Sequence, residues 1–182
     1  IDDTSNTNDS TIKGVIDTWY QNNMVSYTSQ LEDTVFCSDR SYTTNESSLY
    51  FGAYTRLWDN KFPTFKCQNT RDKFTVSASN GNGALNYPVG LITVDELVYA
   101  GSANDDLNYS FYLYIGKNND FWTLSPTLIH NSEPFVFFED VEGDFDYTSS
   151  DLTNGVRPSV SLKPGVEIIG GSGTSLEPFV IE

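Results

Sequence analysis

The sequence is poor in basic residues and lacks long apolar runs, and each shortage excludes a class of function. Only 10 of the 182 residues are Lys or Arg, against 25 Asp or Glu, so the net charge is −15. This charge repels phosphate backbones and anionic membranes, so we expect no nucleic-acid binding. No apolar run approaches the roughly 20 residues that a transmembrane helix needs, so we expect no membrane insertion by this segment.

Histidine and cysteine are also scarce, which limits catalysis and zinc binding. His130 is the single histidine, and it lies in Ile-His-Asn-Ser with no nucleophile-elbow motif, so we expect a protein that is not an enzyme. Cys37 and Cys67 lie outside any CxxC pair, and one histidine cannot complete a zinc set with them. They fit a disulfide of an extracellular protein, and the alternative is two unrelated buried thiols of a cytosolic one.

Aromatic residues are abundant, since 11 Tyr, 12 Phe and 3 Trp accompany a single Met. This composition favours sheets over a helix bundle. Residues 1–9 are polar and are expected to form a linker, followed by a single domain over residues 10–182. We interpret the polar start as that of a trimmed ectodomain or mature product, located outside the cell, either secreted or on its surface.

Two helices are expected. Asp9 or Ser10 can cap the first, which should end at Asn22 and Asn23. Its apolar positions recur with helical spacing at Ile12, Val15, Ile16, Trp19 and Tyr20. The second helix follows Thr93, which forms a capping box with Glu96, and it should end at Gly101. Its carboxylates are explained by capping, so we give them no catalytic role.

Elsewhere the sequence predicts short strands. Residues 31–37 are a candidate strand, and residues 38–86 are irregular and would be held by the disulfide. After the second helix we expect strands at 111–115, 121–124, 133–138, 144–148, 156–162 and 166–169 and a last short strand, with hairpins at 111–124 and 133–148. Pro158 should place its strand at an edge or a bulge. The fold class is therefore α+β, with two helices packed on antiparallel β-hairpins.

Several motifs resemble one family in order and spacing. Residues 91–101, "LITVDELVYAG", are similar to the second-helix motif of the C-type-lectin-like fold of the formylglycine-generating-enzyme kind. "FWTLSP" (121–126) and "GVRPSVSLK" (155–163) lie where that fold has two of its strands. With "FCSDR" (36–40), the chain resembles, over residues 10–182, an uncharacterised domain of bacterial cell-surface and pilin-like proteins. The resemblance implies a C-type-lectin-like fold.

The chain differs from that family at the positions that carry its catalytic and calcium-binding chemistry. Both cysteines precede the second helix, whereas the reactive cysteines of the enzymes lie late in the chain. The related iron enzymes need several histidines. Glu133 and Pro134 are followed by Phe instead of Asn, and no Trp-Asn-Asp occurs, so the calcium site of sugar-binding lectins is missing. We therefore expect no required cofactor.

By fold analogy, loops around 102–108 and 127–154 would bind a glycan or a host or cell-surface protein. The proposed contact residues are Asn131, Phe135, Phe137, Tyr147 and Asp151. One alternative is a structural, pilin-like subunit that contacts copies of itself, with the oligomeric state open. Another alternative is a ligand-binding variable protein whose loop codons are diversified by a retroelement through adenine-directed mutagenesis. Asn codons varied in this way cannot become Lys, Gln, Met or Trp, and residues 127–154 contain none of these four.

Charged residues suggest two further features. Glu142, Asp144 and Asp146 have the oxygen atoms that calcium prefers, and the alternative is a solvated hairpin face. Asp39, Arg40 and Arg157 are expected in structural ion pairs, because an arginine buried in so acidic a chain should bind a carboxylate.

Overall fold

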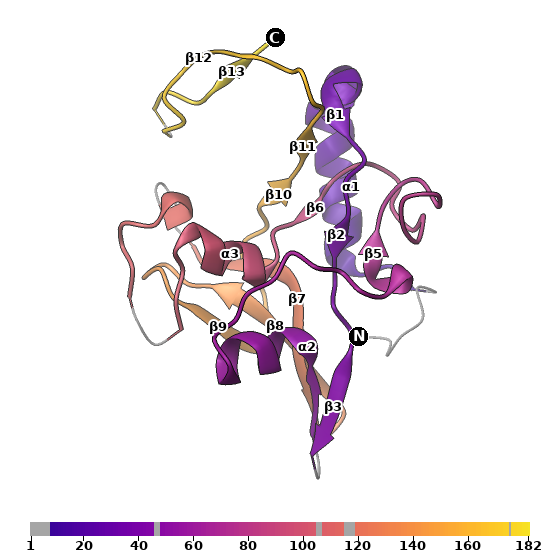
Figure 1. Cartoon of the computed structure of the whole chain (residues 1–182), viewed down its shortest axis with the longest axis vertical. Coiled ribbons are helices and arrows are strands. Elements are labelled where there is room, and N and C mark those ends of the chain that lie inside the picture. The colour runs from indigo at the N-terminus through magenta and orange to yellow at the C-terminus, as the bar shows by residue number, and fades with distance from the viewer. Residues whose placement is uncertain (1–7, 46–47, 105–106, 115–118, 175) are drawn as a thin grey trace.

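The computed structural model describes residues 8–45, 48–104, 107–114, 119–174 and 176–182. Within these ranges the chain is α+β, with several antiparallel sheets, few helices and one disulfide. Figure 1 shows the C-terminal segment at one end of the molecule and the tip of strand β3 at the other. Of the predicted linker, Asn8 and Asp9 are described and both are exposed.

The largest sheet has five antiparallel strands. In spatial order these are β3 (Tyr42–Asn45), β4 (Ser48–Phe51), β7 (Phe121–His130), β8 (Glu133–Glu139) and β9 (Phe145–Ser149). The predicted β8–β9 hairpin is confirmed, with Phe137 opposite Tyr147. Strand β7 is longer than expected and shifts its register on either side of Pro126, which has no N–H for the ladder.

The other strands of the described chain pair in four small antiparallel ladders. They pair β1 (Leu31–Glu32) with β11 (Ser161–Leu162), β2 (Phe36–Cys37) with β5 (Lys73–Phe74), β6 (Gly90–Leu91) with β10 (Pro158–Ser159), and β12 (Ile168–Gly170) with β13 (Val180–Ile181). Each of the predicted strands, 31–37 and 156–162, is therefore divided into two shorter strands. Pro158 lies in a two-stranded ladder, which agrees with its predicted edge position.

The first helix, α1 (Thr11–Asn23), forms as its sequence pattern predicts. The Ser10 side chain caps it by accepting the Lys13 backbone N–H at 3.2 Å. Ile16 and Tyr20 are buried, and the Tyr20 ring stacks on Tyr87 at 4.8 Å. Val15 belongs to the predicted apolar stripe but is 48% exposed, so the buried face is narrower than expected.

The second predicted helix, α3 (Val94–Ala100), has the expected capping box and ends at Gly101, whose φ of 111° is left-handed. Its first turn is fixed to the central sheet, because the Val94 N–H donates to Ser125 Oγ of β7 at 3.0 Å. A further short helix, α2 (Gly52–Tyr54), continues into a π-helical turn, η2 (Thr55–Asp59). The buried residues of this layer are Ala53, Leu57, Val94, Phe137 and Phe145.

Removing the Thr93 hydroxyl tests the capping box of α3. Thr93 Oγ1 accepts the Glu96 N–H, and Glu96 Oε2 accepts the Thr93 N–H at 2.7 Å. We expect Thr93→Ala to lower the free energy of unfolding by about 1 kcal/mol in urea denaturation. Thr93→Ser keeps the hydroxyl and should stay within about 0.5 kcal/mol of the parent chain. Equal losses in both variants would contradict a capping role.

Other elements differ from the prediction. Tyr112–Tyr114 is a 3-10 helix, η4, so the predicted strand at 111–115 is wrong, and residues 115–118 of its predicted hairpin lie outside the described residues. Phe111 is buried with Leu97 and Phe121, so it packs in the core instead of extending along a sheet. Two more 3-10 helices are η1 (Val25–Gln30) and η3 (Thr70–Asp72).

The predicted disulfide is confirmed. Cys37 of β2 is bonded to Cys67, with a Cα–Cα distance of 5.7 Å. The segment 38–86 is largely irregular, as expected, but it also contains the β3–β4 hairpin and the α2–η2 helix that the prediction missed. No helix among the described residues is long and apolar enough to cross a membrane. The disulfide is compatible with an extracellular protein.

Candidate functional site

Five aromatic side chains gather on the five-stranded sheet, and we call them the aromatic cluster. Its members are Tyr50 of β4, Tyr54 of α2, Trp58 of η2, Phe135 of β8 and Tyr147 of β9. Each is partly exposed. Neighbouring ring centroids lie 4.8 Å (Tyr50–Tyr54), 5.7 Å (Tyr54–Trp58), 5.1 Å (Trp58–Tyr147) and 6.1 Å (Phe135–Tyr147) apart.

Local geometry explains why these rings meet. Tyr54 and Trp58 are four residues apart in one helical segment, so they share a face and stack. Tyr147 lies opposite Phe137 in the β8–β9 register, and Phe135 is its diagonal neighbour. In Figure 1, α2 lies beside the strands of this sheet.

Phe137 lies beneath the cluster and is not part of its surface. Its side chain is 0% exposed and packs edge-on against Phe145 at 5.8 Å and against Tyr147 at 6.3 Å. It therefore supports the exposed rings and cannot touch a ligand in this structure, which corrects the predicted role of Phe137 as a contact residue.

Two tyrosines of the cluster, Tyr54 and Tyr147, are held in their neutral form. Burial raises the pKa of Tyr54 above its ordinary value, and the nearby Tyr147 and Asp59 add to this effect. Burial also raises the pKa of Tyr147, and the charge of Asp146 acts in the same direction. Asp59 and Asp146 are exposed. The cluster thus combines neutral phenol O–H donors with carboxylate acceptors beside them.

The remaining predicted contact residues lie in turns. Asn131 is exposed between β7 and β8, where its φ of 49° is left-handed and its amide nitrogen lies 2.9 Å from His130 Nε2. Asp151 is exposed just after β9. The structure therefore brings Phe135 and Tyr147 together and leaves Asn131 and Asp151 at strand ends. Most of segment 127–154 is strand instead of loop, and residues 105–106 of the other predicted loop lie outside the described residues.

The predicted calcium ligands lie at the β8–β9 turn. Asp140 Oδ1 accepts the backbone N–H groups of Glu142 at 2.7 Å and Asp144 at 3.1 Å. Asp146 is exposed on β9. Among the residues that the structure describes, no group of three or more His, Cys, Asp or Glu side chains is placed to hold a metal ion.

Asp39 and Arg40 form ion pairs, as predicted, and the structure identifies their partners. Arg40 Nε lies 2.9 Å from Asp72 Oδ1, and both side chains are buried. Arg56 binds Asp39 at 2.6 Å and Asp95 at 2.7 Å. Burial alone would lower the pKa of Arg56, but its hydrogen bonds to Asp95 and Asp39 outweigh burial and raise it.

Arg157 behaves differently from the prediction. Its guanidinium lies 4.7 Å from the centroid of the Phe121 ring, and Nη1 donates to the Leu113 carbonyl at 3.0 Å. Burial lowers the pKa of Arg157, and the charge of Glu139 only partly offsets this. Among the described residues no salt bridge involves Arg157, so a cation–π contact takes the place of the predicted ion pair.

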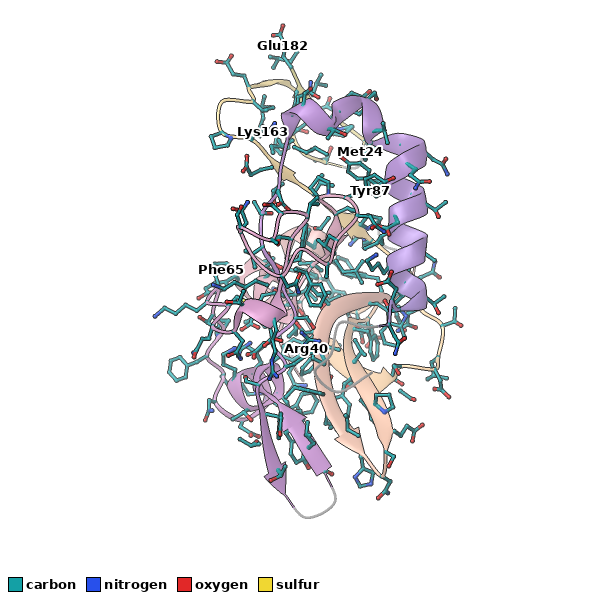
Figure 2. The ribbon with its side chains drawn as sticks, turned by 90° about the vertical axis from the view of Figure 1, so that its right-hand side faces the viewer. Met24, Arg40, Phe65, Tyr87, Lys163 and Glu182 are labelled. Atoms are coloured by element: carbon teal, nitrogen blue, oxygen red, sulfur yellow. A yellow bond between two sulfur atoms is a disulfide. The ribbon has the colours of Figure 1, made fainter. Side chains whose placement is uncertain are left out.

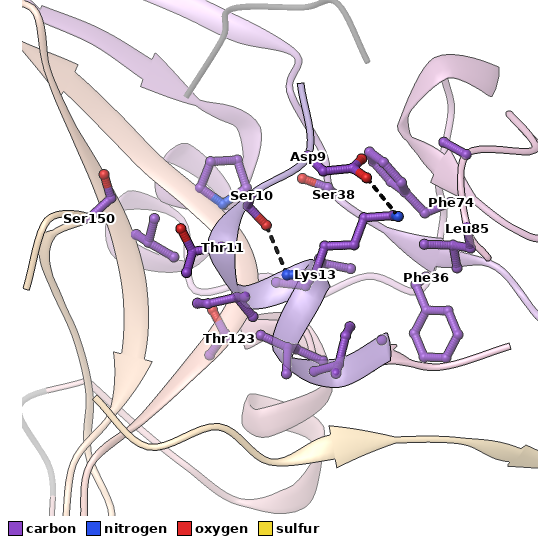
Figure 3. A pocket seen from close by; sticks show the side chains of 18 of the residues that line it. Asp9, Ser10, Thr11, Lys13, Phe36, Ser38, Phe74, Leu85, Thr123 and Ser150 are labelled. Carbon is purple, nitrogen blue, oxygen red and sulfur yellow. Dashed lines mark hydrogen bonds and ion pairs between the residues drawn. The ribbon is translucent and has the colours of Figure 1, made fainter. Parts of the chain in front are cut away.

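A cavity of about 470 Å³ lies between the start of α1 and the strands behind it (Figure 3). Ser10 and Lys13 border it, and Lys13 Nζ lies 3.0 Å from Asp9 Oδ2. Its walls are mainly apolar and include Phe36, Phe74, Leu85, Leu91, Leu124 and Val136. The sequence gives no periodic pattern for this cavity, because its walls come from segments far apart in the chain.

No protein-family model, curated protein or solved structure matches this chain.

Proposed function

We propose that this chain is a non-enzymatic binding module, secreted or displayed on a cell surface, that recognises a carbohydrate through the aromatic cluster. The observation that carries the proposal is the meeting of five partly exposed rings from three strands, β4, β8 and β9, and from the α2–η2 helical segment. Two exposed carboxylates lie beside these rings: the charge of Asp59 helps to raise the pKa of Tyr54, and that of Asp146 helps to raise the pKa of Tyr147.

The chemistry of the cluster suits a sugar. The faces of sugar rings present C–H groups, which pack against the negative face of an aromatic ring. Phenol hydroxyls and carboxylates can then donate to and accept from the sugar hydroxyls. Because the rings already pack on one another, little side-chain freedom is lost when a ligand binds. A protein ligand is the alternative, since tyrosine and tryptophan also dominate protein interfaces.

We also propose that the α+β arrangement is a variant of the C-type-lectin-like fold. The two capped helices, the central antiparallel sheet and the order of the motifs support this proposal. The disulfide and the absence of a membrane-spanning helix among the described residues are compatible with a place outside the cell.

The test is a screen of the purified chain on glycan and cell-surface-protein arrays, followed by titration of cluster variants. We expect Tyr147→Ala to weaken binding to a glycan hit by roughly 30-fold, as for a central interface residue. Tyr147→Phe keeps the ring and should lose less. Tyr27→Ala removes an exposed ring from η1, outside the cluster, and should leave binding unchanged.

Three outcomes would contradict the proposal: a blank glycan array, hits on proteins alone, or glycan binding that Tyr147→Ala leaves intact. Repeating the titration with calcium and then with chelator tests the Glu142, Asp144 and Asp146 turn separately. If binding is lost in chelator, and the cluster variants still bind as the parent chain does, the binding site is at that turn and not at the aromatic cluster.

A further inference from the structure

A short loop beside α3 exposes aromatic rings and lysines together. We call it the cationic-aromatic loop, made of Lys61, Phe62, Phe65 and Lys66. Phe62 is 75% exposed and Phe65 is 68% exposed, and the Phe65 ring stacks on Tyr99 with centroids 4.2 Å apart. Tyr99 is itself 54% exposed. Large apolar groups gathered on a surface in this way indicate an interaction site.

The loop is held in place by its backbone. The Phe62 N–H donates to the Arg56 carbonyl at 2.8 Å, and the Thr64 N–H donates to Asp95 Oδ1 at 2.8 Å. The Tyr99 hydroxyl donates to the Pro63 carbonyl at 3.1 Å, and Cys67 ends the loop in the disulfide. Figure 2 shows Phe65 on the side of the molecule opposite α1. The rings are therefore presented outward by a pre-ordered segment.

The charge of this loop is opposite to that of the chain. Residues 60–71 contain Lys61, Lys66 and Arg71, all exposed, and no Asp or Glu, whereas the whole chain carries −15. An acidic surface that can also accept aromatic rings would complement the loop.

Such a surface lies next to the loop in the same molecule. Lys61 Nζ donates to Asn104 Oδ1 at 3.2 Å. The backbone of the adjacent residue, Ala103, forms an isolated β-bridge with Asp144. Asp144 belongs to the β8–β9 turn, which we call the acidic turn, made of Asp140, Glu142, Asp144 and Asp146. Val141, within this turn, is 42% exposed. The loop and the acidic turn are thus neighbours connected through residues 103 and 104.

We infer that this face binds a second copy of the chain about a two-fold axis. The cationic-aromatic loop of each copy would lie on the acidic turn of the other, so the same pair of contacts forms twice. A surface that carries both halves of a complementary pair is self-complementary, as a two-fold interface requires. The ring burial and the two sets of opposite charges stabilise the pair against the repulsion between two chains of net charge −15.

The test is sedimentation velocity from about 1 µM to about 500 µM protein at about 0.15 M salt. We expect a reversible monomer–dimer equilibrium. Reversing the loop charges with K61E/K66E should weaken it at least about tenfold, and so should E142K/D146K in the acidic turn. F62S/F65S should weaken it similarly by removing the rings.

The decisive sample is an equimolar mixture of K61E/K66E and E142K/D146K. In this mixture each loop faces a turn of opposite charge, so a heterodimer should form although each variant alone stays monomeric. L176S is the control, because Leu176 is 93% exposed in the segment between β12 and β13 and should not affect dimerisation. A chain that is monomeric throughout, a mixture that fails to associate, or dimers lost with L176S would each overturn the inference. No glycan is present, so the result does not depend on whether the aromatic cluster binds a carbohydrate.

Discussion

Replacing Asp72 with alanine is expected to lower the free energy of unfolding by about 3–5 kcal/mol. Asp72 is 1% exposed and its Oδ1 lies 2.9 Å from Nε of Arg40, which is 5% exposed. Asp72 Oδ2 also lies 3.3 Å from the Arg40 backbone nitrogen. Without the carboxylate, a buried guanidinium loses its counter-charge inside the fold. Urea denaturation at neutral pH measures the loss.

A matched ion pair on the surface provides the control. Asp9 binds Lys13 at 3.0 Å, but its side chain is 68% exposed, so Asp9→Ala should cost at most about 1 kcal/mol. If Asp72→Ala does not fold, Asp72→Asn keeps the shape and some hydrogen bonds and should fold with reduced stability. Similar small losses in Asp72→Ala and Asp9→Ala would show that the Arg40–Asp72 pair contributes no more than a solvated one.

Removing the disulfide is expected to have the second-largest effect. Cys37 and Cys67 are 30 residues apart, and closing a loop of that length stabilises a fold by about 3–4 kcal/mol in the chain-entropy model. The double variant C37S/C67S should lose that amount in urea denaturation. The loss should be accompanied by faster proteolysis between Lys61 and Lys66, because the bond anchors the end of that loop.

Reductant supplies the internal comparison for this prediction. It should lower the stability of the parent chain toward that of C37S/C67S and should leave the double variant unchanged. A loss below about 1 kcal/mol would mean that the small ladder of β2 and β5 and the Arg40–Asp72 pair already order the segment.

Local chemistry explains which elements were predictable. Ser10, Thr93, Glu96 and Gly101 act on backbone groups within one turn, so both predicted helices and their ends follow from the sequence alone. The β8–β9 hairpin is equally local. The β3–β4 hairpin was missed although residues 42–51 contain Tyr, Thr and Phe, which are strand formers. The two-residue strands are too short to show an alternating pattern. Their partners are also far away in the chain, so no local signal marks the pairing.

Of the candidate aromatic cluster, only residues on the strands were predicted from the sequence. Phe135 and Phe137 point to the same face of β8, and no pattern within the strand distinguishes the exposed ring from the buried one. What buries Phe137 is the layer of α2 and η2, which lies in the segment that the sequence left irregular. Tyr50, Tyr54 and Trp58 come from that same segment, so the other half of the aromatic cluster was missed. Arg157 faces an aromatic ring instead of an acid for a similar reason, because Phe121 reaches it from another part of the fold.

The pairing of β1 with β11 has a consequence for the rate of folding. Leu31 lies opposite Leu162, and Lys163 Nζ donates to the carbonyl of Ser29, a residue 134 positions away. Figure 1 shows these two short strands side by side. Closing so long a loop costs chain entropy before the contacts form. Ladders between remote segments slow folding. During synthesis on the ribosome, β1 has no partner until β11 has emerged, so the region around Leu31 is one of the last to reach its native pairing.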